Sequence, residues 1–433
     1  MNPVFQFIAA TLIVALTLGF TLYAVASTSD VQLMTYSQLQ LEPVANSLMQ
    51  NFVLTPGSPV DWGSNTKVTP NQLASFGLST DPQTNTAYSL DVFKLDRILN
   101  DSFVANPYYI PPTVAGSLLG IYQQGHFNYG FDFRMVPALN ITISNISTAT
   151  TTLYSVKVLD FQGRPAVNAF VNASEFSFCV VTKGNSVSPS SYNSTHTSAF
   201  NVTNLAGTAT VTLSQPPVGC TSQNGNGGNG GGSTGNVEST DIMIVSASYY
   251  GMAFQNFLQS SNICKSQMII IGQYLVANFT GKNGASSQSN CSFVNQNNGS
   301  GKVATTVFEI TSRLNIVLDP ANYCSTSQPP CSILNHGADN YTVFALSKPV
   351  DPNVILAGLI FTTNGKQYFV IATNPTTPTG IIEYTSNSLT TVSANTGDGL
   401  KLASVPAAVT VTRYVTVGTN TWFASLTVWR MGQ

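Results

Sequence analysis

The chain has 433 residues, enough for about two to four domains of ordinary size, and only 8% of them are charged, with a net charge of −2. A chain with so few charges and no basic block is excluded as a nucleic-acid-binding protein, and its 43% hydrophobic content excludes intrinsic disorder. The polar surface must therefore consist mainly of Ser, Thr, Asn and Gln, and the turn-separated alternating segments described below predict a mainly β fold.

The N-terminal segment is predicted to be one apolar helix of membrane length. Val4 to Ala26 contains no charged residue and twelve Leu, Ile, Val or Phe residues, a pattern typical of a bilayer-spanning helix. The alternative is a cleaved signal peptide, because Ala24-Val25-Ala26 is an acceptable cleavage site; the apolar run is longer than an ordinary signal-peptide core, which favours retention. The side chains expected to line the assembly face of the helix are Phe5, Phe7, Ile8, Leu12, Ile13, Leu16 and Phe20.

The helix is predicted to continue past a bilayer's thickness, to about residue 53, with a kink or restart at Pro43. The basis is an apolar face at helical spacing, formed by Val31, Met34, Leu41, Val44, Leu48 and Phe52. The first half is apolar all round, so it can be buried in lipid or against other copies of itself. The amphipathic second half can pack on a globular head.

Residues 54–149 are predicted to form the first part of a β-rich head, with a short helix within Leu90 to Ile98 that has Val92, Leu95 and Ile98 on one face. Residues 150–257 are predicted to be an inserted β-sandwich, because strands such as Tyr154 to Asp160 and Asp241 to Tyr250 are separated by turns. Residues 258–433 are predicted to complete the head.

Two hairpins are expected in this last part of the chain. Asn364-Gly365 is a typical two-residue hairpin turn. Val409 to Val417 and Thr421 to Trp429 form the second hairpin, and the latter strand is apolar on both faces. Such a strand is either central in its sheet or covered by the N-terminal helix.

Cysteines and glycosylation sequons indicate an exported body. The six cysteines, an even count, are interpreted as disulfides, with nearest-neighbour pairing favoured and buried free thiols as the alternative; they are Cys179, Cys220, Cys264, Cys291, Cys324 and Cys331. Ten Asn-x-Ser/Thr sequons, all after the apolar segment, predict N-linked glycans; they are Asn100, Asn140, Asn145, Asn172, Asn193, Asn201, Asn278, Asn290, Asn298 and Asn340.

No catalytic, cofactor-binding or metal-binding motif stands in the context that its chemistry requires. The GxGxxG and GxSxG matches within Asn224 to Gly235 lie in a glycine-rich loop and do not follow a strand and open a helix. The chain has three histidines, and they form neither a zinc-binding spacing nor a nucleophile–base arrangement. We therefore expect no enzyme activity and no cofactor. The alternative that includes an enzyme activity is a secreted hydrolase cleaved after Ala26.

Two resemblances follow from these segments. Asp160, Gly163, Pro165 and Ala169, with Gly207 and Ala209 further on, resemble the motifs of bacterial-type immunoglobulin-like domains, with Asn204 in place of the expected Thr. The order of parts, from apolar helix to amphipathic helix to β-rich head, resembles archaeal type IV pilin-like proteins.

Three further features carry the pilin resemblance: Trp62-Gly63, then Phe76-Gly77-Leu78 before the short helix, and the closing hairpin ending at Trp429-Arg430. The resemblance implies an extracellular, glycosylated filament subunit, major, minor or tip, that serves adhesion. It would polymerise with itself or in a mixed filament through its N-terminal helices and be membrane-anchored before assembly. The alternative is a single-pass surface adhesin or envelope-layer protein that does not polymerise.

Overall fold

A computed structural model of the chain describes residues 14–21, 23, 39–81, 87–99, 108–147, 152–181, 192–214, 237–259, 267–272, 274–278, 305–311, 316–323, 334–336, 339–346, 350, 354–363, 366–373, 381–386 and 408–431. These residues are mainly in β-strands, which confirms the prediction of a mainly β fold. Helix is present at residues 14–21 and 39–54. The remainder of the predicted N-terminal helix lies outside the described residues.

The helical elements after residue 54 are short: η1 (Pro70–Gln72), α2 (Val92–Ile98) and α3 (Pro112–Leu118). The strands are β1 (Ser89–Leu90), β2 (Tyr122–Gln123), β3 (His126–Phe127), β4 (Tyr129–Pro137), β5 (Leu139–Asn145), β6 (Thr152–Asp160), β7 (Phe170–Val181), β8 (Tyr192–Val202), β9 (Thr208–Leu213), β10 (Val237–Tyr249), β11 (Met252–Gln259), β12 (Gln267–Ile271), β13 (Tyr274–Asn278), β14 (Thr305–Thr311), β15 (Ile316–Tyr323), β16 (Leu334–His336), β17 (Asp339–Leu346), β18 (Val354–Thr363), β19 (Lys366–Thr373), β20 (Ile382–Thr385), β21 (Ala408–Val417) and β22 (Asn420–Arg430).

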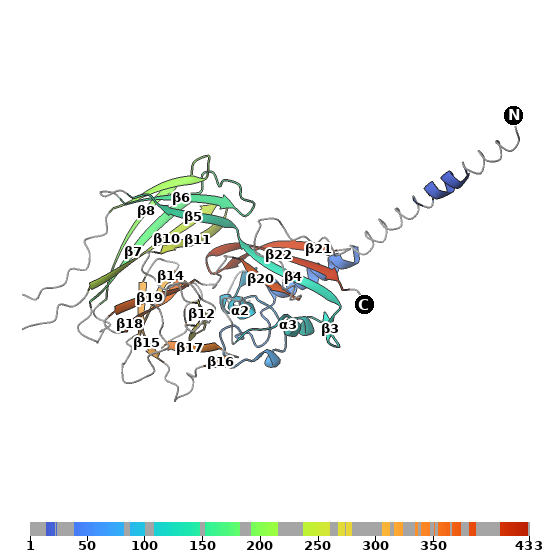
Figure 1. Ribbon diagram of the computed structural model, residues 1–433, viewed down its shortest axis with the longest axis horizontal. Helices are drawn as coiled ribbons and strands as arrows, with labels where there is room; N and C mark the ends of the chain where they lie inside the picture. The colour runs from blue at the N-terminus through green and yellow to red at the C-terminus, as the bar shows by residue number, and fades with distance from the viewer. Residues whose placement is uncertain are drawn as a thin grey trace, which may run out of the picture.

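A five-stranded sheet in the order β1-β21-β22-β4-β20 is the centre of the head (Figure 1). The predicted β21–β22 hairpin is confirmed, with Ala408 opposite Trp429 and a turn at Gly418-Thr419. β22 is a central strand, which is one of the two alternatives that its apolar faces left open. Alternate side chains from Trp422 to Val428 enter the head core, while Phe423 on the other face stacks on Phe161, with 4.3 Å between the ring centroids.

The helix at residues 39–54 packs on the inner face of this sheet. Leu41, Leu48, Met49, Phe52 and Val53 are at most 3% exposed and belong to the same core as the sheet. Burying five large apolar side chains contributes on the order of 10 kcal/mol to folding. The amphipathic half of the predicted helix, where it is described, is thus part of the head core, and the helix continues through Pro43.

A β-sandwich follows, formed by a three-stranded sheet (β5-β6-β9) and a four-stranded sheet (β11-β10-β7-β8) around their own core. The turn motif predicted from the sequence has a physical basis. The Asp160 carboxylate accepts hydrogen bonds from the backbone N–H groups of Gln162 and Arg164, each 2.9 Å long, and Gly163 adopts a φ of 80°. Asn204 fills the expected Thr position and accepts from two backbone N–H groups.

Two boundaries differ from the sequence prediction. The sandwich begins at β5, before residue 150, because alternate residues from Leu139 onward enter the sandwich core and β5 pairs with β6. The segment predicted as the second part of the head is also divided. Its first portion forms a separate sheet in the order β12-β13-β17-β15-β14-β18-β19 with β16 paired to β17, in which the predicted hairpin before and after residues 364–365 is confirmed as β18–β19.

The outer face of the five-stranded sheet carries a buried carboxylate, Asp132 of β4, which is 9% exposed. Burial raises the pKa of Asp132 to about 6; Glu383 adds to this rise and Arg134 opposes it. Because the folded-state pKa exceeds the unfolded value, the folded protein binds more protons between about pH 4 and pH 6. Its stability should therefore fall as the pH rises through that interval, by up to about 3 kcal/mol.

Asp132→Asn is expected to remove this decrease and to raise the stability at pH 7 relative to the original protein. Urea unfolding midpoints at several pH values between 4 and 7 would measure it. Glu42→Gln, which changes an exposed carboxylate on the helix, serves as the matched control. An unchanged pH profile for Asp132→Asn would contradict the assignment of this titration to Asp132.

Candidate functional site

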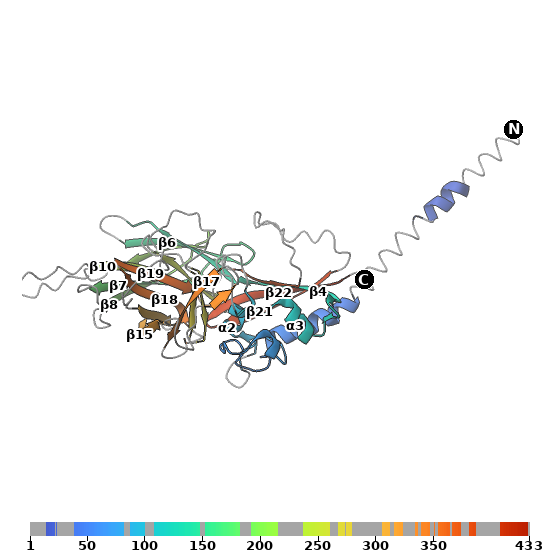
Figure 2. The ribbon, with the colours of Figure 1, turned by 60° about the horizontal axis from the view of Figure 1, so that its bottom comes forward.

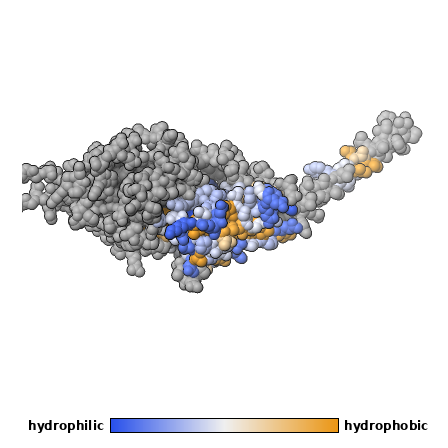
Figure 3. Space-filling model, turned by 90° about the horizontal axis from the view of Figure 1, so that it is seen from below, coloured by the Kyte–Doolittle hydropathy of each residue, from blue (hydrophilic) through white to orange (hydrophobic). Residues whose placement is uncertain are grey.

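The helical segment at residues 14–21 is apolar and exposed. It stands apart from the body of the molecule in two views, and its hydrophobic surface is coloured orange beyond the head (Figures 1, 2 and 3). Leu16 is 66% exposed and Phe20 is 74% exposed, and Val14, Leu18 and Tyr23 are similarly open. The helix at residues 39–54 buries one apolar face in the head, whereas this segment presents large apolar side chains without packing them.

The two threonines of this segment satisfy their own hydroxyl groups. The Thr17 hydroxyl donates to the Val14 carbonyl at 3.0 Å, and the Thr21 hydroxyl donates to the Thr17 and Leu18 carbonyls at 2.9 and 3.0 Å. A hydroxyl bonded within its own helix can enter an apolar environment without leaving an unpaired donor. The segment is therefore chemically suited to burial in lipid or among other helices.

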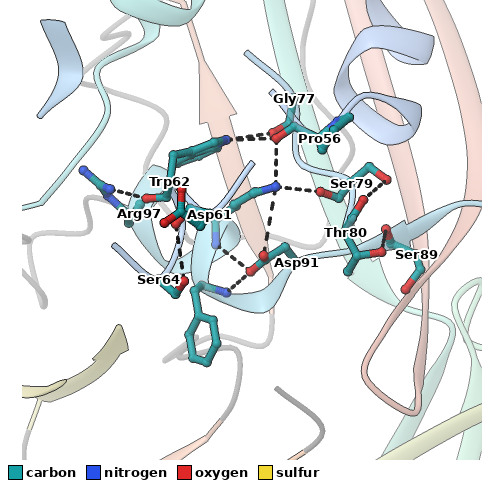
Figure 4. Close-up of polar contacts among 12 residues, drawn as sticks. Pro56, Asp61, Trp62, Ser64, Gly77, Ser79, Thr80, Ser89, Asp91 and Arg97 are labelled. Atoms are coloured by element: carbon teal, nitrogen blue, oxygen red, sulfur yellow. Dashed lines mark hydrogen bonds and ion pairs between the residues drawn. The ribbon is translucent and has the colours of Figure 1, made fainter. Parts of the chain in front are cut away.

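The C-terminal end of the second helical segment is fixed to the head by hydrogen bonds among residues that we call the helix–head junction: Thr55, Pro56, Trp62, Gly77, Ser79 and Lys94. Figure 4 labels Pro56, Trp62, Gly77 and Ser79 of this set. The carbonyl of Phe52 accepts from Leu78 N at 2.9 Å, and that of Thr55 accepts from Ser79 N at 3.0 Å. The carbonyl of Pro56 accepts from both Trp62 Nε1 at 3.1 Å and Lys94 Nζ at 2.8 Å. The head therefore bonds a carbonyl of the last helical turn, at Phe52, and the carbonyls of the two residues that follow the helix.

Lys94 brings a positive charge close to that helix end. It is fully buried, donates to the Ser79 carbonyl at 2.7 Å as well as to Pro56, and lies 4.0 Å from the Asp91 carboxylate. Burial lowers the pKa of Lys94, and the nearby Asp91 opposes that shift. A cation at a helix C-terminus interacts favourably with the helix dipole, so the charge has a structural role at this position.

Two buried cations lie close to the Trp62 ring. Lys94 Nζ is 5.8 Å and the Arg97 guanidinium carbon 5.7 Å from the centre of that ring. The Arg97 guanidinium donates to the carbonyls of Trp62, Val68 and Tyr108. Burial lowers the pKa of Arg97 to about 10. These cations bond carbonyls from separate loops, so they hold residues 55–80, α2 and the chain near residue 108 together.

Glycine is required at two positions of the junction for close packing. A Cβ at Gly63 would lie 2.6 Å from the Lys94 side chain, and a Cβ at Gly77 would overlap the Thr55 carbonyl and hydroxyl. The Trp62-Gly63 and Phe76-Gly77-Leu78 pairs of the sequence analysis therefore meet at the end of the helix and are not independent motifs.

Gly77→Ala is expected to lower the free energy of unfolding by about 3 kcal/mol, because the new methyl group meets backbone that cannot move away freely. Gly19→Ala is the matched control, since a Cβ there meets nothing within 4 Å. Chemical denaturation of both variants measures the effect. Equal stability of the two variants would contradict the close packing assigned to Gly77.

Of the predicted assembly residues, Leu16 and Phe20 are described, and both are exposed on helix. Phe5, Phe7, Ile8, Leu12 and Ile13 lie outside the described residues. Cys179 is on β7, whereas the other five cysteines lie outside the described residues, so the pairing of the cysteines stays a prediction.

The sequons are distributed over several strands. Asn140 and Asn145 are exposed on β5, Asn172 is half-buried on β7, and Asn201 is exposed on β8. Asn193, Asn278 and Asn340 occupy strand positions, and Asn100, Asn290 and Asn298 lie outside the described residues.

Within the described part of the chain, no group of three or more His, Cys, Asp or Glu side chains could hold a metal ion. Among the helices of the same residues, none combines the length and apolarity needed to cross a bilayer. A scan of the chain against protein-family models finds no match, and no curated protein matches it significantly.

Proposed function

We propose that the chain is an extracellular subunit of a type IV pilin-like filament, polymerising through its apolar N-terminal helix and displaying a glycosylated head for adhesion. The observation that carries the proposal is the exposed apolar helical segment at residues 14–21, whose hydroxyl groups are satisfied internally. A subunit with this segment gains stability when several copies bury it together.

The helix–head junction supports the same proposal. A filament whose core is a bundle of helices must transmit every force on a head to its own helix. Buried side chains from Leu41 to Val53 and the bonds to the carbonyls of Phe52, Thr55 and Pro56 join the helix to the head through packing and hydrogen bonds together. In this proposal the chain acts before assembly as a membrane-anchored protein, needs no cofactor and catalyses no reaction.

Microscopy of surface material sheared from cells that produce the full chain tests the proposal. We expect thin filaments that bind an antibody raised against the head. Recovery of the chain only as detergent-extracted monomers, with no labelled filaments, would overturn polymerisation and favour a single-pass surface protein.

The structure also determines how the helix should be altered in such a test. Deleting Val31 to Phe52 would remove residues from Leu41 onward that form the head core, so loss of filaments in that variant would reflect unfolding. Substitutions at the exposed positions of residues 14–21 leave the head core intact and are the informative changes.

A further inference from the structure

An uncharged aromatic surface lies on the outer face of the four-stranded sheet of the sandwich. Phe170 is 47%, Phe200 74% and Val202 48% exposed. Phe170 is directly opposite Val202 across β7 and β8, and the rings of Phe170 and Phe200 are stacked with centroids 5.8 Å apart. Neighbouring exposed apolar side chains indicate a surface that another group covers.

Asn172 lies within this surface. It is two residues after Phe170 on the same strand, and it is directly opposite Phe200 on β8 and Ser246 on β10. Residues at i and i+2 of a strand, and residues directly opposite on neighbouring strands, share one face of the sheet, with Cβ atoms of opposite residues about 4.5–5.5 Å apart. A group attached to the Asn172 side chain therefore lies beside both phenylalanine rings.

The residues around Asn172 favour a neutral, hydroxyl-rich occupant. The same face carries Ser198, Ser246 and Ser248 and has no charged residue at the positions paired around Asn172. A charged ligand would find no partner here. A sugar ring, in contrast, presents C–H groups that pack on the electron-rich face of an aromatic ring, and its hydroxyl groups can bond serine side chains.

The sequence contains one further feature at this position. Asn172-Ala173-Ser174 is an N-glycosylation sequon, and among the ten sequons of the chain it is the one with an aromatic residue two positions before the Asn. Strand alternation places that residue, Phe170, beside the attachment atom. A sugar attached at this sequon would therefore also explain why the two rings are exposed on the protein alone.

We propose that Asn172 carries an N-linked glycan whose first sugar packs on Phe170 and Phe200. In the attachment step, Asn172 Nδ2 forms a bond with the anomeric carbon of a glycosyl phosphate donor. The bond from that carbon to the phosphate oxygen breaks, the phosphate takes the electron pair, and Nδ2 gives up one proton to a base of the transferase. The proposal rests on the export contained in the proposed function, and it does not rest on polymerisation.

The folded structure indicates when attachment occurs. Ser174, the third residue of the sequon, is only 1% exposed, so a transferase must read the sequon before this face is packed. The sequon asparagine Asn201 differs from Asn172, because its Nδ2 already donates a hydrogen bond to the Thr210 carbonyl, 2.6 Å away. Asn140 is exposed, but Ala138 stands two positions before it, so it offers a matched sequon without a ring.

Glycopeptide mass spectrometry of the full chain from glycosylating cells tests attachment, and a four-variant comparison tests the packing. We expect a glycan on Asn172, and we expect Asn172→Gln to lower the melting temperature by about 2–4 °C. The same change in a Phe200→Ser background should give little or no further decrease, whereas Asn140→Gln should have the same effect in both backgrounds.

Two results would overturn the proposal: an unmodified Asn172 in the purified protein, or an equal melting-temperature decrease for Asn172→Gln in both backgrounds. Filaments should form in Asn172→Gln cells as they do with the original chain. If neither strain forms filaments and Asn172 is modified in the original chain, the result would count against the proposed polymerisation. The glycan assignment would still stand.

Discussion

Lys94→Met is expected to lower the free energy of unfolding by about 3 kcal/mol, because the methionine keeps the apolar stem and removes the ammonium group. The Ser79 carbonyl then loses the bond from Nζ, and the Pro56 carbonyl retains only Trp62 Nε1. Each buried acceptor left unpaired costs about 1–3 kcal/mol, and the half-buried Asp91 carboxylate, which loses its cation, adds to the cost. Relief from burying the Lys94 charge offsets part of this loss.

Lys67→Met provides the control, because Lys67 is exposed and such changes usually alter stability by less than about 0.5 kcal/mol. Denaturant titration of both variants gives the difference. Hydrogen exchange adds a local measurement: the amides of Leu78 and Ser79, which donate to the helix end, should exchange faster in Lys94→Met. Equal stability of the two lysine variants would show that the junction does not depend on this ammonium group.

The elements that could be predicted from the sequence are those with local determinants. The β21–β22 and β18–β19 hairpins follow from turns joining alternating strands, and the turn after Asp160 follows from a carboxylate that bonds its own following residues. The short helix was likewise predictable, because Asp91 caps it by accepting from Phe93 N and Lys94 N.

The pairing of distant segments could not be predicted in the same way. β4 pairs with β20 and β22, which lie hundreds of residues later, and strand periodicity alone does not say which strands are partners. For the same reason the alternation in Leu139 to Asn145 fits a head strand as well as a sandwich strand. Only its pairing with β6 assigns it to the sandwich.

The sequence-based interpretation of the candidate site was incomplete at the charged residues. Helical spacing predicted that Val92, Leu95 and Ile98 form the buried face of α2, yet Lys94 and Arg97 are also buried. Their partners are backbone carbonyls of loops, which leave no residue-type signal in a sequence. The sequence signal that was available for the junction is the pair Trp62-Gly63 together with the pair Phe76-Gly77. Glycine beside a large aromatic residue indicates close backbone packing.

The largest effect on assembly is expected from the double change Leu16→Asp and Phe20→Asp. Both side chains are exposed on the helical segment, so the isolated subunit should keep its stability. In a helix bundle or a bilayer, each buried aspartate costs about 2.5–3.5 kcal/mol, so the pair costs roughly 5–7 kcal/mol per subunit. A change of that size reduces an association constant by more than about a thousandfold, because each 1.4 kcal/mol is a factor of ten.

Val60→Asp is the matched control, since Val60 is an exposed apolar residue of the head, at 44% exposure. Filaments counted by microscopy in sheared surface fractions, together with the melting temperature of the extracted chain, separate assembly from folding. We expect the double variant to lose filaments without a change in melting temperature and the control to retain both. Filaments of normal abundance in the double variant would exclude residues 14–21 from the filament core, because no packed bundle of apolar helices could accept two carboxylates per subunit on adjacent turns.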